Sequence, residues 1–243
     1  MPCLKDNFAY LVIDEPTGRA AVVDPGEAAP VEAALAAEQV TLVAIWATHH
    51  HHDHVGGIAG LVAAHPGTEV VVGVHDAARV AGATHRLADG EPFSLGGSIG
   101  QVIHNPAHTL GAITFMIDGA AFTGDTLFGA GCGRLFEGDA AMMHASLSRL
   151  AALPRETRVY FGHEYTAGNL RFAAAVEPDN AAIHQRATTI PKPSTPSTIA
   201  LERATNPFLR VTEPAVIAAA TARGAAGDPV SVFAAIRSWK DNF

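Results

Sequence analysis

Cysteine is nearly absent from this sequence, which contains only Cys3 and Cys132 among its 243 residues. Two cysteines cannot build a disulfide framework, and a reducing compartment keeps both as thiols. The chain also lacks any uninterrupted apolar run of roughly eighteen residues, which excludes a membrane-spanning helix. No basic segment followed by an apolar stretch stands at its start, so we expect no secretory signal and a cytoplasmic location.

Positive charge is scarce as well. The sequence has 16 Lys and Arg against 24 Asp and Glu, a formal charge of −8, and no run of basic residues. Such a protein repels nucleic acid unless a local basic patch overcomes the net charge. We therefore expect no nucleic-acid partner. We also expect a monomer with no membrane partner. With 48% apolar and 16% charged residues, the composition is that of a soluble globular protein.

The first two thirds of the chain alternate strand and helix patterns. Short β-branched runs bounded by Gly, Pro and Asp predict strands over residues 10–13, 20–23, 42–47, 69–72, 99–103, 113–117, 120–123 and 158–161. Ala-rich and Leu-rich segments predict helices over 30–39 and 140–153. From residue 169 the strand signals disappear, and we expect helices over 180–189, 213–223 and 229–239, with a turn or linker at 191–197. The predicted organisation is an α/β domain over residues 1–166 and an α-helical domain over 167–243.

The predicted strand over 42–47 runs directly into the segment THHHHDHVGG at residues 48–57. Side chains alternate in an extended segment, so His49 and His51 can reach one metal together, while a turn after His51 would aim Asp53 and His54 at a neighbouring position. Imidazole and carboxylate suit zinc, iron or manganese. A purification tag or a solvated polar loop is the alternative, but neither usually lies between a buried strand and Gly-Gly.

Three later segments offer the further ligands that a two-metal site needs. His108, Asp125 and His163 each follow a predicted strand, and loops at strand ends are where rigid scaffolds display functional groups. Alone, each histidine would be an ordinary surface or core residue, and Asp125 a helix or turn cap. The joint pattern indicates a metal site. The other histidines lack such a context and we interpret them as ordinary: His65, His75, His85, His104, His144 and His184.

The ordered segments THHHHDHVGG, PAHTLG, FTGDTLFGAGCGRLFEG and VYFGHEYTAGNL, with the C-terminal RSWKDNF, resemble glyoxalase II, the hydroxyacylglutathione hydrolase family of the metallo-β-lactamase superfamily. The similarity runs from PCLKDNFAYLV to Phe243. It implies an αββα metallo-β-lactamase sandwich with a small α-helical, substrate-binding C-terminal domain. It also implies that His49, His51 and His108 hold one metal, that Asp53, His54 and His163 hold the other, and that Asp125 bridges both.

The activity implied by the resemblance is hydrolysis of the thioester S-D-lactoylglutathione to D-lactate and glutathione, the second step of methylglyoxal detoxification. A hydroxide bridging two divalent metals would attack the thioester, with Asp53 orienting it. We expect zinc, with iron or manganese as alternatives, because zinc lowers the pKa of bound water to about 7. The leaving thiolate, with a pKa of about 8.5, needs little help from a general acid. A serine or cysteine nucleophile is disfavoured because the sequence has no G-x-S-x-G.

Basic and aromatic positions of the family also have counterparts here. Arg134, Arg237 and Lys240 match cations that bind glutathione, and Tyr165 matches a tyrosine that contacts its peptide backbone. Arg can hold a carboxylate bidentately, whereas Lys supplies a mobile point charge. Phe136 stands where many members have tyrosine, and Ala112 where many have histidine. His52 replaces a residue that is often aromatic, and we expect it to point away from the metals.

Other readings of the same residues remain open. A mononuclear-iron dioxygenase acting on glutathione persulfide would need one metal instead of two, and a broader-specificity thioesterase would share the hydrolytic site. A non-enzymatic, metal-retaining interaction protein would ordinarily have lost some ligands, and none is missing here. The number of metals per chain separates the first of these from a hydrolase.

Overall fold

The computed structural model describes all residues, Met1–Phe243. The chain forms two compact units, and each contains two separate stretches of sequence. The first unit comprises Met1–His104 and Thr109–Gly124, and the second comprises Asn105–His108 and Asp125–Phe243. No helix is both long and apolar enough to cross a membrane.

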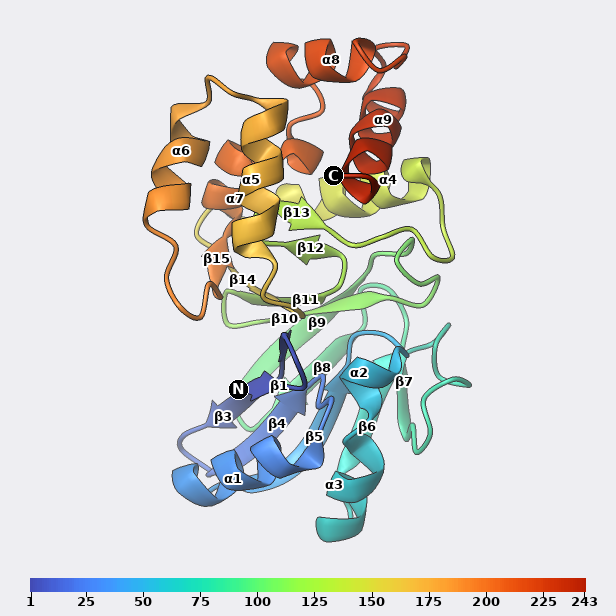
Figure 1. Ribbon diagram of the computed structural model, residues 1–243. Helices are drawn as coiled ribbons and strands as arrows, with labels where there is room; N and C mark the ends of the chain where they lie inside the picture. The colour runs from blue at the N-terminus through green and yellow to red at the C-terminus, as the bar shows by residue number, and fades with distance from the viewer. The chain divides into compact units, whose positions relative to one another are not determined.

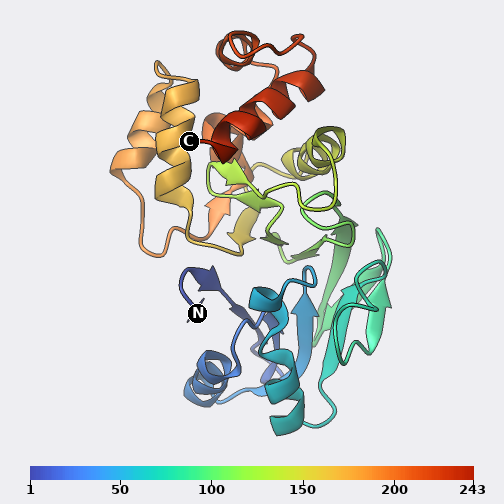
Figure 2. The same ribbon diagram turned by 45° about the vertical axis from the view of Figure 1, so that its right-hand side comes forward.

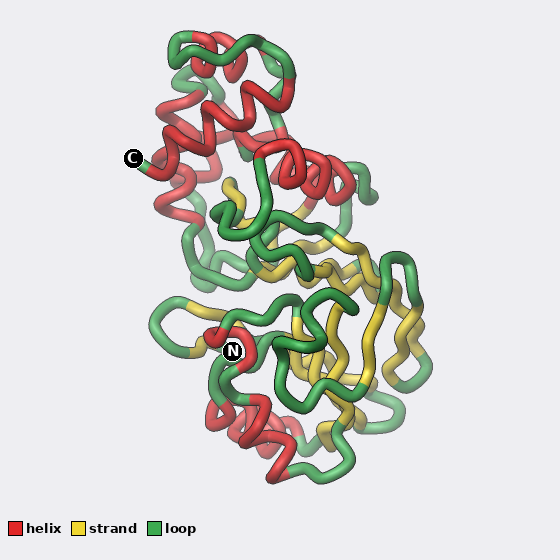
Figure 3. Tube along the Cα trace, turned by 90° about the vertical axis from the view of Figure 1, so that its right-hand side faces the viewer, coloured by secondary structure: helices red, strands yellow, loops and turns green.

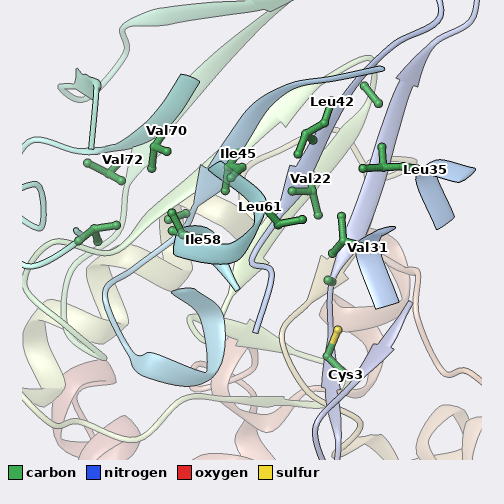
Figure 4. Close-up of a cluster of buried hydrophobic side chains, with 14 of the residues drawn as sticks. Cys3, Val22, Val31, Leu35, Leu42, Ile45, Ile58, Leu61, Val70 and Val72 are labelled. Atoms are coloured by element: carbon green, nitrogen blue, oxygen red, sulfur yellow. The ribbon is translucent and has the colours of Figure 1, made fainter. Parts of the chain in front are cut away.

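One sheet of the first unit follows the order β3-β4-β5-β6-β7. Its strands are β3 (Tyr10–Asp14), β4 (Arg19–Val23), β5 (Thr41–Ala47), β6 (Glu69–Gly73) and β7 (His85–Leu87). The first pair is antiparallel and the others are parallel. Helices α1 (Ala28–Glu38) and α3 (Ile58–Ala64) connect parallel strands and cover one face (Figure 1). Figure 4 shows their apolar side chains, such as Val31 and Leu61, packed against Val22, Ile45 and Val70.

The second sheet of this unit is an antiparallel meander. It contains β8 (Pro92–Leu95), β9 (Ser98–His104), β10 (Ile113–Ile117) and β11 (Ala120–Gly124). The ring of Trp46 on β5 lies 4.7 Å from that of Phe93 and 5.5 Å from that of Phe115, so the two sheets pack face to face. Figure 3 shows the strands of this unit in yellow with helices on one side. Short strands β1 (Pro2–Cys3) and β2 (Asn7–Phe8) pair with each other near the N-terminus.

The second unit is mostly helical. Its helices are α4 (Ala140–Ala151), α5 (Thr166–Val176), α6 (Ala181–Thr188), α7 (Ile199–Thr205), α8 (Pro214–Thr221), α9 (Pro229–Asp241) and the 3-10 turn η1 (Pro207–Leu209). Helix α4 packs against α9, as Figure 2 shows, and the rings of Phe172, Phe208 and Phe233 lie buried within this unit. Its strands form two short antiparallel pairs: β12 (Leu127–Phe128) with β13 (Gly131–Cys132), and β14 (Arg158–Phe161) with β15 (Ser197–Thr198).

Every strand and helix expected from the sequence is present, with ends shifted by up to two residues. The expectation that no strand follows residue 169 is wrong, because Ser197–Thr198 forms the two-residue strand β15. A strand of two polar residues is too short for an alternating pattern. The sequence reading also missed α3, α5 and α7, as well as α2 (His52–Val55), whose single turn follows His51 as predicted.

Candidate metal centre and substrate-binding groups

The segment after β5 gathers four donor residues in the first unit. His51 is still extended, with φ −61° and ψ 141°, and the single-turn helix α2 begins at the next residue. Nε2 of His49 lies 3.1 Å from Nδ1 of His51, and the rings of His49 and His54 are 4.2 Å apart. Oδ2 of Asp53 lies 3.8 Å from Nε2 of His54. The local fold therefore brings together the histidine and aspartate side chains that the sequence pattern selects.

Asp24, at the end of β4, orients two of these histidines. Its carboxylate accepts the Thr48 backbone N–H and the Thr48 hydroxyl, both at 2.7 Å, and lies 3.1 Å from Nδ1 of His54. Because the Thr48 hydroxyl proton goes to Asp24, its oxygen accepts from Nδ1 of His49 at 3.1 Å. Both histidines thus carry a proton on Nδ1 and leave the lone pair of Nε2 available to a metal. Histidines that bind metals usually donate their other ring N–H to such an acceptor. The sequence analysis missed this role of Asp24 and used the residue only to mark the end of a predicted strand.

Asn7 holds the remaining carboxylate of this cluster. Its Nδ2 donates to Oδ2 of Asp53 at 3.0 Å and to the Asp53 backbone carbonyl at 3.2 Å. Asn7 is buried, while Asp53 is partly exposed. The amide therefore fixes the orientation of Asp53 and leaves that carboxylate accessible. No sequence pattern marks this contact, because the partners are 46 positions apart in the chain.

The second unit gathers His108, Asp125 and His163. Oδ2 of Asp125 lies 3.5 Å from Nε2 of His108 and 3.2 Å from Nε2 of His163. Nδ1 of His108 donates to the Arg134 carbonyl at 3.0 Å, so in the neutral ring the lone pair of Nε2 faces the carboxylate. A lone pair facing a buried carboxylate oxygen is repulsive unless a positive charge lies between them. This donor arrangement fits a metal cation.

Glycine at position 133 is required by this packing. A Cβ there would overlap the Asp125 carbonyl oxygen and would come within 2.9 Å of Nδ1 of His108. The backbone of the GCGR segment can therefore approach His108 closely enough for the Arg134 carbonyl to accept its proton. A buried glutamate, Glu202, supports the same loop by accepting the Ala130 N–H at 2.7 Å.

Aromatic rings lie beside the donors of the second unit. The rings of His163 and Tyr165 are parallel within 2° and 4.8 Å apart, and the Phe136 ring lies 5.2 Å from that of His108. Phe136 is 62% exposed and Tyr165 41% exposed, so both rings are accessible to a ligand. The two predicted aromatic contacts thus flank predicted metal ligands.

The predicted substrate-binding cations gather around Asp241 in the second unit. Arg237 is buried; its guanidinium donates to the Cys132 carbonyl at 3.0 Å and to Asp241 at 2.9 Å. Nε of Arg134 lies 4.0 Å from Asp241. Burial lowers the pKa of Lys240, and the neighbouring charges of Arg237 and Arg171 lower it further. The concentration of positive charge suits an anionic ligand, and it includes Arg171, which sequence reasoning missed.

Several histidines interpreted as ordinary have partners of their own. His65 lies 3.0 Å from Glu32, Nε2 of His184 donates to the Pro178 carbonyl, and Nε2 of His104 donates to the Leu110 carbonyl. His52 is exposed, and Ala112 is buried.

Two family models cover nearly the whole chain. Residues 5–163 match the metallo-beta-lactamase superfamily, and residues 164–243 match the hydroxyacylglutathione hydrolase C-terminus. The hydroxyacylglutathione hydrolase of Alkalilimnicola ehrlichii is 50% identical over 99% of this chain and 97% of that protein.

Solved structures agree with the fold. ETHE1 from Myxococcus xanthus is 28% identical with a TM-score of 0.69, over 96% of this chain and 85% of that chain. TTHA1623, solved in a di-iron-bound form, is 30% identical with a TM-score of 0.61, over 84% of this chain and 95% of that chain. The sheets, helices and donor clusters define a metal-dependent hydrolase of the metallo-β-lactamase fold with a helical C-terminal region. Within that class, the chain belongs to the hydroxyacylglutathione hydrolase family.

Proposed function

We propose that this protein hydrolyses S-D-lactoylglutathione to D-lactate and glutathione, the second step of methylglyoxal detoxification, as a cytoplasmic monomer. The observation that carries the proposal is a family match along the whole chain combined with donors already oriented for metal binding. In each unit, a predicted ligand histidine donates a hydrogen bond from Nδ1 to a fixed acceptor. His54 donates to Asp24, and His108 donates to the Arg134 carbonyl.

The proposed ligand sets follow the family resemblance. His49, His51 and His108 hold one metal, Asp53, His54 and His163 hold the other, and Asp125 serves both. Divalent metals, here proposed to be zinc, supply Lewis acidity and lower the pKa of water to about 7 when bound. The all-nitrogen-and-oxygen donor set supports this choice and also accommodates iron or manganese.

The chain's own residues position the reactants. Asp53, held by Asn7, is the carboxylate that orients the attacking water. The departing group is a thiolate with a pKa of about 8.5, so no protein side chain needs to protonate it. Glutathione carries two carboxylates, and the cations Arg134, Arg237 and Lys240 bind them, assisted by the ring of Tyr165 and the apolar face of Phe136.

The work is divided along the sequence. We assign catalysis to residues 1–166 and much of the substrate binding to residues 167–243. The two family matches meet between residues 163 and 164, which supports this division. The alternative, a mononuclear-iron dioxygenase, is disfavoured because the relative that is 50% identical over 99% of this chain is named hydroxyacylglutathione hydrolase.

Two thioesters test the proposal. Release of free thiol from S-D-lactoylglutathione is compared with release from the D-lactoyl thioester of N-acetylcysteamine, which lacks both carboxylates. We expect efficient hydrolysis of the first and a kcat/KM at least about a hundredfold lower for the second, since each charge-assisted hydrogen bond contributes roughly 1.5–3 kcal/mol. Equal rates would overturn glutathione recognition, and no thiol release from either would overturn hydrolysis.

A further inference from the structure

A buried carboxylate lies beside the HxHxDH segment but outside the predicted ligand set. Asp76 follows β6 in a turn in which its N–H donates to the Gly73 carbonyl at 3.1 Å. Its side chain is only 2% exposed. A buried carboxylate is costly unless hydrogen bonds compensate its lost hydration, so its partners indicate its role.

Asp76 holds both the backbone and the side chain of His50. Its Oδ2 accepts the His50 N–H at 3.0 Å and lies 2.9 Å from Nδ1 of the same residue. His50 stands between the predicted ligands His49 and His51. These two contacts fix the main chain and the ring of this middle residue and turn it toward Asp76. Its two neighbours face each other instead, with Nε2 of His49 3.1 Å from Nδ1 of His51.

The same carboxylate contacts a second ligand-bearing loop. The Thr109 hydroxyl lies 3.4 Å from Oδ2 of Asp76, and a Cβ at Gly111 would overlap Oδ1. Glycine there lets the backbone of this loop lie directly against the carboxylate. Thr109 follows the predicted ligand His108. Asp76 therefore touches residues adjacent to His49, His51 and His108.

We propose that Asp76 is a positioning residue for the metal ion held by these three histidines. The inference rests on the proposed ligand assignment. It goes beyond that assignment because Asp76 supports the ligands of one ion and not those of the other. Loss of a partner that orients ligands costs roughly 10- to 100-fold in metal affinity. The ion assigned to Asp53, His54 and His163 does not depend on His50 or Thr109, so the loss falls on one ion.

The test measures zinc affinity by chelator competition on the full chain. In Asp76→Asn, we expect one of the two zinc ions to bind about 10- to 100-fold more weakly and the other to bind as in the parent. His50→Ala should reproduce this loss. His50→Asn should restore most of the affinity, because its side-chain amide can donate in place of Nδ1.

Glu32→Gln provides a matched control. Glu32 on α1 and His65, directly after α3, form a carboxylate–histidine contact of 3.0 Å. Neither residue adjoins a predicted metal ligand in the sequence. We expect this variant to bind both ions as the parent does. Melting of the metal-free Asp76→Asn protein within a few degrees of the metal-free parent separates positioning from a folding defect.

Two results would overturn the inference: parent-like affinity for both ions in Asp76→Asn, or an equal loss of both ions accompanied by early melting of the metal-free variant. Thiol release from S-D-lactoylglutathione is measured on the same parent preparation. A parent that binds two ions but does not hydrolyse this thioester would overturn the proposed function and leave the affinity comparison valid.

Discussion

Arg237 and Lys240 both stand on α9, yet the structure gives them different surroundings. The Arg237 guanidinium donates to the buried Cys132 carbonyl, pairs with Asp241 and lies 5.0 Å from the centre of the Phe208 ring. Nζ of Lys240 lies over the rings of Phe172 and Phe243, 5.3 and 5.8 Å from their centres. Replacing each with alanine therefore separates binding from folding.

Arg237→Ala should lower the free energy of unfolding by about 2–4 kcal/mol. A hydrogen bond from a charged group contributes roughly 1.5–3 kcal/mol, and the pair with the partly exposed Asp241 adds less. For a chain of this size that loss lowers the melting temperature by about 4–16 °C. Lys240→Ala should lower the free energy of unfolding by less than about 1 kcal/mol. The lost contacts with the two rings are offset because the variant no longer partly buries a charged ammonium group.

Substrate binding should fall in both variants. If both cations contact glutathione, each alanine variant loses about ten- to a hundredfold in kcat/KM for S-D-lactoylglutathione, with metal content unchanged. Thermal unfolding at saturating zinc and initial rates of thiol release measure the two effects separately. Arg237→Met keeps part of the packing over Phe208 and isolates the charge. Equal melting of the parent and Arg237→Ala would refute the stability argument, and unchanged kcat/KM in the double variant would refute the binding role.

Three further changes test other parts of the site. Burial raises the pKa of the Cys132 thiol from 9.0 to about 11, so between these pH values the folded protein keeps a thiol proton that the unfolded chain loses. The free energy of unfolding of the parent should therefore fall relative to that of Cys132→Ser as pH rises from about 9 to 11. Urea midpoints of the two proteins that change in parallel across this range would contradict this expectation. Asp125→Ala should lose metal and activity together, and retention of both ions with near-normal turnover would defeat its bridging assignment. Phe136→Tyr adds a hydroxyl to an exposed ring, so KM for the glutathione thioester should fall severalfold with unchanged melting; an unchanged KM would show that no hydrogen bond is gained.

Sequence patterns were informative where residue types recur at characteristic spacings along the chain. Short runs of β-branched residues bounded by Gly, Pro and Asp predicted the longer strands, and the spacing of the HxHxDH segment indicated its four donors. The supporting carboxylates escaped prediction because their side-chain partners are distant in sequence: Asp76 lies 26 positions from His50, and Asp24 lies 30 positions from His54. No local period marks such pairs.

The burial of Arg237 could have been anticipated. Val232, Phe233, Ile236 and Arg237 are the buried residues of α9, and spacings of three and four residues place Phe233, Ile236 and Arg237 on one helix face. The sequence reading considered only the charge of Arg237. Helix periodicity therefore carried information about its packing that the match to family positions did not.

One paired measurement decides whether this chain is a two-metal thioester hydrolase. Elemental analysis of the metal-replete protein is combined with the stoichiometry of S-D-lactoylglutathione turnover in the same preparation. We expect two divalent ions per chain, with D-lactate and free glutathione thiol formed in equal amounts. A fully loaded protein with one ion per chain and no thiol release would show that the chain is not a two-metal thioester hydrolase.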